Sequence, residues 1–136
     1  METVAPGRIF LIITGILFSV LGIVNLLASG MGLAADYYWD DSVTATIPWN
    51  IYYTVTLVGA LFHIPIGVIG IAYSSNLKKS PILRTLGVVC IGYGILDVFL
   101  ILFVFSGVFS VLTLVGLAIP ILYLVGAQKN VVAYGG

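Results

Sequence analysis

The sequence feature that most limits the fold is the stretch between Arg84 and Lys129, which contains one formal charge, Asp97. A single helix needs about 20 apolar residues to cross a hydrocarbon layer that is about 30 Å thick. The stretch is roughly twice that length, which is far too long for one core helix of a soluble domain. We therefore expect two membrane crossings that fold back on each other, and the rest of the chain repeats this pattern.

The composition also favours a membrane environment. Charged residues make up 7% of the 136 residues, hydrophobic residues make up 61%, and the mean hydropathy is +1.22. A soluble domain carries about 25% charged residues. The formal net charge is zero, so no attraction to nucleic acid is expected. The single cysteine, Cys90, excludes an intrachain disulfide and is interpreted as a small buried hydrophobic residue.

Four apolar segments are long enough to cross a bilayer. They cover approximately residues 9–29, 52–73, 85–104 and 108–127. Backbone groups that face lipid must be hydrogen-bonded within their own segment, so each crossing should be a helix. The first segment is long for the core of a signal peptide, and we expect it to remain as a membrane helix. The predicted fold is an all-α, four-helix bundle that forms one membrane domain over residues 1–136.

Charged residues orient the predicted bundle. With four crossings, all basic residues lie on one side, and three acidic residues of the loop at approximately 30–51 lie on the other. The positive-inside rule then places both termini and the loop at approximately 74–84 in the cytoplasm. A plasma (cytoplasmic) membrane location is expected. The basic residues are Arg8, Lys78, Lys79, Arg84 and Lys129, and the acidic loop residues are Asp36, Asp40 and Asp41.

The predicted external loop is rich in aromatic residues. Tyr37, Tyr38 and Trp39 lie within it, and Trp49 lies where the second helix enters the membrane. Amphipathic rings favour the headgroup region of a bilayer, so they are interpreted first as interfacial anchors. The alternative is a partner-binding surface, because tyrosine and tryptophan are also enriched at protein interfaces.

The second and fourth segments share a short sequence pattern. Thr-Leu-Val-Gly occurs at residues 56–59 and 113–116, and Ile-Pro-Ile occurs at residues 64–66 and 119–121. The pattern favours a parallel duplication of a two-helix hairpin, related by an axis along the membrane normal. Chance similarity between two apolar helices is the alternative. In either case each proline removes one helical hydrogen bond and can kink its helix.

Small residues recur at helical spacing along each segment. Membrane helices associate through close packing and polar contacts, because lipid tails are as apolar as leucine. We therefore predict that these residues face other helices, either within one bundle or between copies in a homo-oligomer. The predicted packing positions are Gly15, Ser19, Gly22, Gly59, Gly67, Gly70, Gly87, Gly94 and Gly116.

The chemically informative residues are Asp97 and His63, which are predicted to lie at similar depths near the middle of the membrane. An unpaired aspartate at a helix centre costs at least about 2.5 kcal/mol. Asp97 is therefore expected either to be protonated or to accept a hydrogen bond from His63, Asn25, Thr113 or Tyr93. Two interpretations of this polar cluster stay open. It is either a buried clasp that fixes helix register or a site for a proton or cation.

The sequence contains no recognisable catalytic constellation, metal cluster or phosphate-binding loop. We therefore expect neither enzymatic activity nor a cofactor or metal. The favoured hypothesis is a structural, assembly or accessory role, in which small-residue faces and the aromatic loop contact other copies or a larger membrane complex. The alternative is an oligomeric small-solute or proton-coupled transporter or channel that uses Asp97 together with His63.

Overall fold

The computed structural model describes residues 5–38, 49–104 and 111–135, with side chains placed for 5–35, 50–102 and 116–135. The elements are α1 (Arg8–Tyr38), α2 (Trp49–Ala72), the short 3₁₀ helix η1 (Leu77–Lys79), α3 (Ser80–Val104) and α4 (Val111–Gly135). The four long helices are each long and apolar enough to cross a membrane. The prediction of an all-α, four-helix fold is confirmed.

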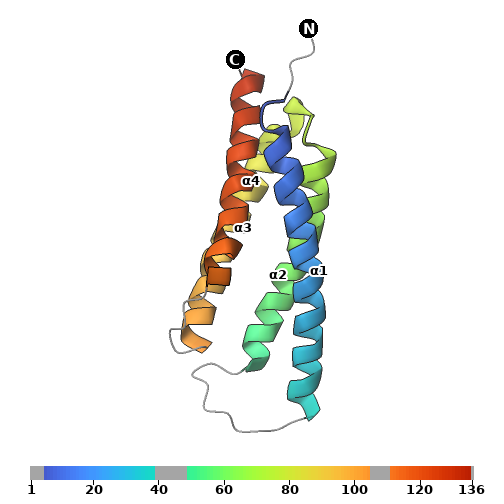
Figure 1. The fold of residues 1–136 in the computed structure, drawn as a ribbon, viewed down its shortest axis with the longest axis vertical. Helices are drawn as coiled ribbons and strands as arrows, with labels where there is room; N and C mark the ends of the chain where they lie inside the picture. Colours follow the sequence, from blue (N-terminus) through green and yellow to red (C-terminus); the bar gives the residue numbers. More distant parts are fainter. Residues whose placement is uncertain (1–4, 39–48, 105–110, 136) are drawn as a thin grey trace.

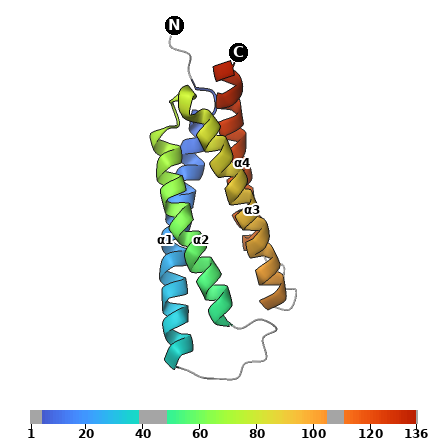
Figure 2. The ribbon, with the colours of Figure 1, turned by 180° about the vertical axis from the view of Figure 1, so that it is seen from behind.

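The four helices form a bundle of two antiparallel hairpins. Helix α1 lies along α2, and α3 lies along α4, while α1 also contacts α4 and α2 contacts α3 (Figures 1 and 2). The first and last described residues lie at the same end of the bundle as η1 (Figure 1). All five basic residues belong to segments at this end, which we call the basic end.

The helix bounds differ from the predicted ones most clearly at α1. The prediction ended this helix at residue 29 and began a long loop there, but α1 continues to Tyr38. Alanine, leucine and methionine between residues 31 and 35 favour helix. Gly32 lies against the ring of Tyr53 on α2, so the absence of a side chain lets the two helices stay in contact. The helices therefore extend into the predicted loop at 30–51, over residues 30–38 and 49–51.

The predicted loop at 74–84 is also mostly helical. Ser80 accounts for this, because its hydroxyl donates to the carbonyl of Leu77 at 2.5 Å and its N–H donates to the same oxygen. Pro81 follows in the first turn of α3, where its missing N–H costs nothing. At the other end of the sequence, α4 extends to Gly135 rather than stopping at 127.

Apolar side chains cover the outside of the bundle as well as its interior. Ile9, Leu27, Phe62 and Val132 are each at least 60% exposed, although all lie in membrane-length helices. The interior contains a cluster formed by Leu11, Phe18, Ile66, Leu83, Cys90, Ile119, Tyr123 and Ala127. Because hydrophobic surface of this extent has no counterpart in a water-soluble monomer, the chain is a small four-span membrane protein.

Four threonine and serine hydroxyls bond to a carbonyl of their own helix. Thr14 donates to the carbonyl of Phe10 at 2.6 Å, and Ser19 donates to the carbonyl of Gly15 at 2.9 Å. Thr56 and Thr85 likewise bond to the carbonyl four residues earlier. This local bonding removes the cost of placing a hydroxyl in an apolar environment.

The two copies of the shared sequence pattern have different surroundings. Gly59 is buried, whereas Gly116 is exposed and nothing lies within 4 Å of a Cβ added there. Pro65 is exposed, whereas Pro120 is fully buried. The residues that match in sequence therefore play different packing roles in α2 and α4.

Candidate functional site

Helices α1 and α2 meet most closely at a pair of facing glycines. A Cβ added to Gly15 would lie 2.7 Å from the carbonyl oxygen of Gly67, and one added to Gly67 would lie 2.5 Å from the carbonyl oxygen of Gly15. Ser19 borders the same contact, with its hydroxyl oxygen 2.5 Å from the Cβ position of Gly67. About two turns along α1 from Gly15, Gly22 faces Ile64. Backbone-to-backbone approach of this kind needs glycine on both helices.

Two tyrosines join the hairpins by the same construction. The ring of Tyr93 on α3 lies on Gly59, and its hydroxyl donates to the carbonyl of Val55 at 2.8 Å. The ring of Tyr123 on α4 lies on Gly70, and its hydroxyl is 3.5 Å from the carbonyl of Ile66.

In both cases the accepting carbonyl is four residues before the glycine, so it already belongs to the helical hydrogen bond of that glycine. We call these two contacts the tyrosine latches. Gly59 and Gly70 are about three turns apart and therefore lie on the same face of α2. A side chain at either glycine would displace a ring. The sequence pattern suggested small residues at both positions, but it did not reveal the tyrosines that fill the space.

At the basic end the hairpins are joined by Asn130, which the sequence analysis missed. Its side chain is fully buried. Its amide oxygen accepts the N–H of Gly7 at 2.6 Å, and its amide nitrogen donates to the carbonyl of Ser74 at 3.0 Å. One side chain of α4 therefore holds the segment before α1 and the end of α2. We call this arrangement the Asn130 clasp.

Glycines make the Asn130 clasp possible. Gly7 lies directly against the backbone of Gly126, and a Cβ at Gly126 would lie 2.7 Å from the Cβ of Phe10. Next to this contact, the ammonium of Lys129 lies 4.4 Å from the centre of the Phe10 ring. The N-terminal segment is thus held against α4 by backbone packing, a hydrogen bond and a cation–π contact.

The predicted polar cluster is arranged differently from the expectation. His63 lies between two aromatic rings, stacked on Phe18 at 5.1 Å and edge-on to Tyr93 at 5.3 Å between ring centres. Its Nδ1 is buried and has no hydrogen-bond partner among the residues that the structure describes.

The Oδ1 atom of Asp97 is likewise buried and without a hydrogen-bond partner in the described part of the chain. The electrostatic neighbours of this carboxyl group include Tyr52 and Tyr93. The Tyr93 hydroxyl is bonded to the carbonyl of Val55, and the His63 ring is stacked on Phe18, so neither of these two residues is a partner of this oxygen. Tyr93 is the residue that His63 and Asp97 share as a neighbour.

The other predicted positions are scattered. Asn25 is half-buried on α1. Gly87 faces Leu124, and Gly94 faces Leu117, so both lie in the α3–α4 contact. Trp39 lies outside the described residues, and the side chains of Thr113, Tyr37, Tyr38 and Trp49 also lie outside them.

Within residues 5–38, 49–104 and 111–135 there is no group of three His, Cys, Asp or Glu side chains that could hold a metal ion. No protein-family model matches the chain, and no match was found among curated proteins or solved structures.

Proposed function

We propose that the protein is a non-enzymatic structural, assembly or accessory component of a membrane, which associates with a second copy or with a larger complex through the outer face of α3. The interior polar groups support this role, because the Asn130 clasp and the tyrosine latches use them to hold the bundle together.

The observation that carries the proposal is the exposure of α3. Only 11% of its membrane-length segment is buried, compared with 28% or more in each of the other helices. Its exposed residues include a stripe at alternating three- and four-residue spacing, which is the spacing of a helix–helix seam. We call it the α3 seam, and it consists of Ile82, Thr85, Val89, Gly92, Leu96 and Phe99.

Gly92 is central to the α3 seam. Nothing lies within 4 Å of a Cβ added at this position, so the glycine is not needed by the contacts within the chain. A small residue in the middle of an apolar seam allows a second helix to approach closely. The exposed rings and branched side chains above and below it would then pack against the partner.

A bilayer association measurement tests this role. Single-molecule photobleaching in liposomes at low protein density should find two or more copies per particle, or one copy with a co-purified partner. Gly92→Phe should lower the associated fraction at least about tenfold, because a ring would hold the seams apart. Gly30→Phe is the matched control, since Gly30 on α1 also has nothing within 4 Å. Equal effects of the two substitutions, or a monomeric wild type without partners, would contradict the proposal.

The same proposal places the basic end in the cytoplasm. Arg8, η1 and Lys129 would then lie on the inner side of the membrane, with the segment at 39–48 outside. Thiol labelling of single cysteines at Ser75 and Ala133, in a Cys90→Ser background, should occur from the same side of the membrane. Labelling from opposite sides would exclude four crossings.

A second function is favoured by the unpartnered atoms of His63 and Asp97. Buried polar atoms without partners are rare in proteins, and an ionisable side chain inside a membrane often marks an ion or proton path. Under this alternative the protein is an oligomeric transporter or channel, and Asp97 carries the proton or cation. A pH-dependent flux in proteoliposomes that Asp97→Asn abolishes, with the assembly intact, would establish it. Absence of flux from the wild type supports the structural role.

A further inference from the structure

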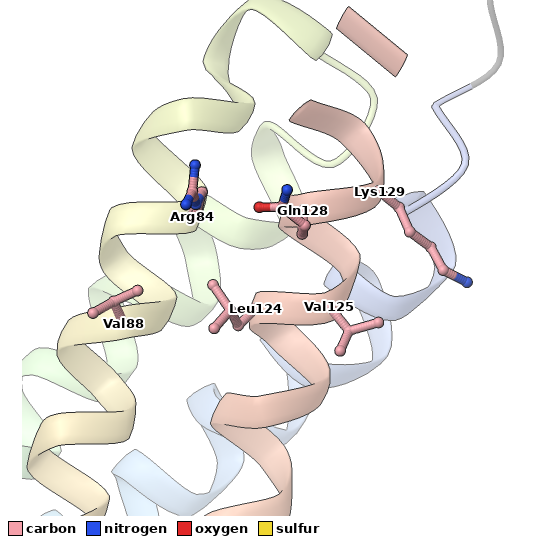
Figure 3. A pocket seen from close by; sticks show the side chains of 6 residues that line it. All are labelled: Arg84, Val88, Leu124, Val125, Gln128 and Lys129. Carbon is pink, nitrogen blue, oxygen red and sulfur yellow. The ribbon is translucent and has the colours of Figure 1, made fainter. Parts of the chain in front are cut away.

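A groove of about 390 Å³ lies on the outer side of the bundle between α3 and α4, near the basic end (Figure 3). Its walls combine apolar side chains with polar and basic ones. The lining residues are Arg84, Val88, Leu124, Val125, Gln128 and Lys129.

The groove follows from the antiparallel register of the two helices. Gly87 allows close approach at this level, since a Cβ added there would lie 3.2 Å from the Cα of Leu124. Val88 therefore faces Leu124, and one turn closer to the basic end Arg84 faces Gln128 (Figure 3). The polar pair, Arg84 and Gln128, thus lies closer to the basic end than the apolar pair, Val88 and Leu124.

This layering matches the profile of a membrane leaflet. Arg84 is four residues into α3, hence about 6 Å along the helix from Ser80. Its side chain is exposed, and an arginine near a helix end extends its charged group toward the headgroups. Val88 and Val125 are also exposed and lie on the hydrocarbon side of it.

The charge at this site is uncompensated by the described part of the chain. Among the residues whose side chains the structure describes, the acidic one is Asp97, which lies more than three turns further along α3 than Arg84. Lys129 adds a second positive charge at the rim, and its ammonium extends toward Phe10 rather than toward Arg84 (Figure 3). Gln128 adds amide N–H donors beside the guanidinium.

We propose that this groove binds an anionic glycerophospholipid from the leaflet at the basic end. The guanidinium of Arg84 donates to the phosphate in the bidentate geometry that suits arginine, and the Gln128 amide donates to a second headgroup oxygen. An acyl chain lies along Val88, Leu124 and Val125. The proposal is independent of the association through the α3 seam.

An anionic lipid fits better than either a free phosphate ion or a zwitterionic lipid. A free phosphate ion would contact only the polar and basic side chains of the groove and would leave its apolar side chains uncovered. A zwitterionic lipid would bring its own cation toward Arg84 and Lys129, which costs binding energy by like-charge repulsion. The headgroup charge and the acyl chain are therefore both required.

Native mass spectrometry of the intact protein tests the site. The protein is released from mixed nanodiscs that contain phosphatidylglycerol and phosphatidylcholine with identical acyl chains. We expect one phosphatidylglycerol to be retained at least about tenfold more than phosphatidylcholine. Arg84→Gln should remove this preference. Lys78→Gln is the matched control, because Lys78 lies in η1 at the same end but outside the groove.

Two further experiments test whether the bound phosphate belongs to a lipid or is a free ion, and whether the apolar side chains of the groove contribute to binding. Val88→Trp, at an exposed position, should lower retention of the lipid by filling the groove while Arg84 is kept. Inorganic phosphate at millimolar concentration should not displace the bound lipid. Equal losses in Arg84→Gln and Lys78→Gln would indicate general surface charge and overturn the proposal. Displacement by inorganic phosphate, or no preference for the anionic lipid in the wild type, would also overturn it.

Discussion

The basic end and the middle of the bundle differ in whether their buried polar atoms are hydrogen-bonded. At the basic end the two polar ends of the Asn130 side chain are both hydrogen-bonded, and the contacts join three segments. In the middle, His63 Nδ1 and Asp97 Oδ1 are buried without partners in the described chain, and the hydroxyl of Tyr93, a neighbour of both residues, is bonded to the carbonyl of Val55. The polar atoms of both regions are buried in the protein, so each of them carries a desolvation cost.

This difference separates groups that hold the fold from groups that do not. A buried amide with both bonds made contributes to stability and fixes which helices are neighbours. A buried polar atom without a bond adds no hydrogen bond to the fold, so its presence requires another reason. We therefore assign the joining of the hairpins to the Asn130 clasp, the tyrosine latches and the glycine contacts, and we leave His63 and Asp97 as the residues of the alternative transport function.

The largest effect is expected at the glycine contact between α1 and α2. Gly67→Val places branched carbon atoms against the backbone of Gly15, which cannot move aside as a flexible side chain would. The free energy of unfolding in mixed micelles should fall by about 3 kcal/mol. Gly30→Val, at the open glycine of α1, should change it by less than about 0.5 kcal/mol. Similar losses in both variants would show that general helix propensity, rather than the α1–α2 contact, explains the effect.

Next in size is the loss of the Asn130 clasp. Asn130→Leu keeps the volume but leaves the N–H of Gly7 and the carbonyl of Ser74 without this partner, so unfolding free energy should fall by about 2 kcal/mol. The N-terminal segment should also become accessible to protease. Gln128→Leu, at an exposed amide two residues earlier, is the control and should leave both readouts unchanged. A protected N-terminus in Asn130→Leu would contradict the clasp.

A smaller effect is expected from removing the hydroxyl of a tyrosine latch. Tyr93→Phe should cost about 1 kcal/mol, because its bond to Val55 is 2.8 Å long. Tyr123→Phe should cost less, since the corresponding distance to Ile66 is 3.5 Å. Tyr134→Phe, at an exposed ring near the end of α4, serves as the control. Thermal unfolding of the three variants would show whether the order holds; the reverse order would indicate that the rings, not the hydroxyls, join the hairpins.

The sequence was sufficient for the all-α fold and the number of membrane-length helices. Apolar length is a strong signal, because a helix is the only way for an isolated segment to satisfy its backbone in lipid. The end of α1 was predicted too early, since the predicted helix stopped at the end of the apolar run, at residue 29. In the bundle Gly32 accommodates the ring of Tyr53.

The contacts that join the hairpins could not be predicted in the same way. Asn130 lies beyond the predicted end of the last helix and directly after Lys129, so it resembled part of a solvated tail. Its partner Gly7 is 123 residues away in the chain, and sequence periodicity carries no information about such a pair. For Asp97 the sequence indicated burial, but the partner depends on how Tyr93 is already used.

The most direct test compares Asp97→Asn with Asn130→Leu for unfolding free energy in the same micelles. Removing the charge of Asp97 breaks no hydrogen bond at Oδ1, so Asp97→Asn should be neutral or slightly stabilising while Asn130→Leu loses about 2 kcal/mol. If Asp97→Asn instead destabilises the protein as strongly as Asn130→Leu, Asp97 helps to hold the bundle, and the division between the two regions is wrong.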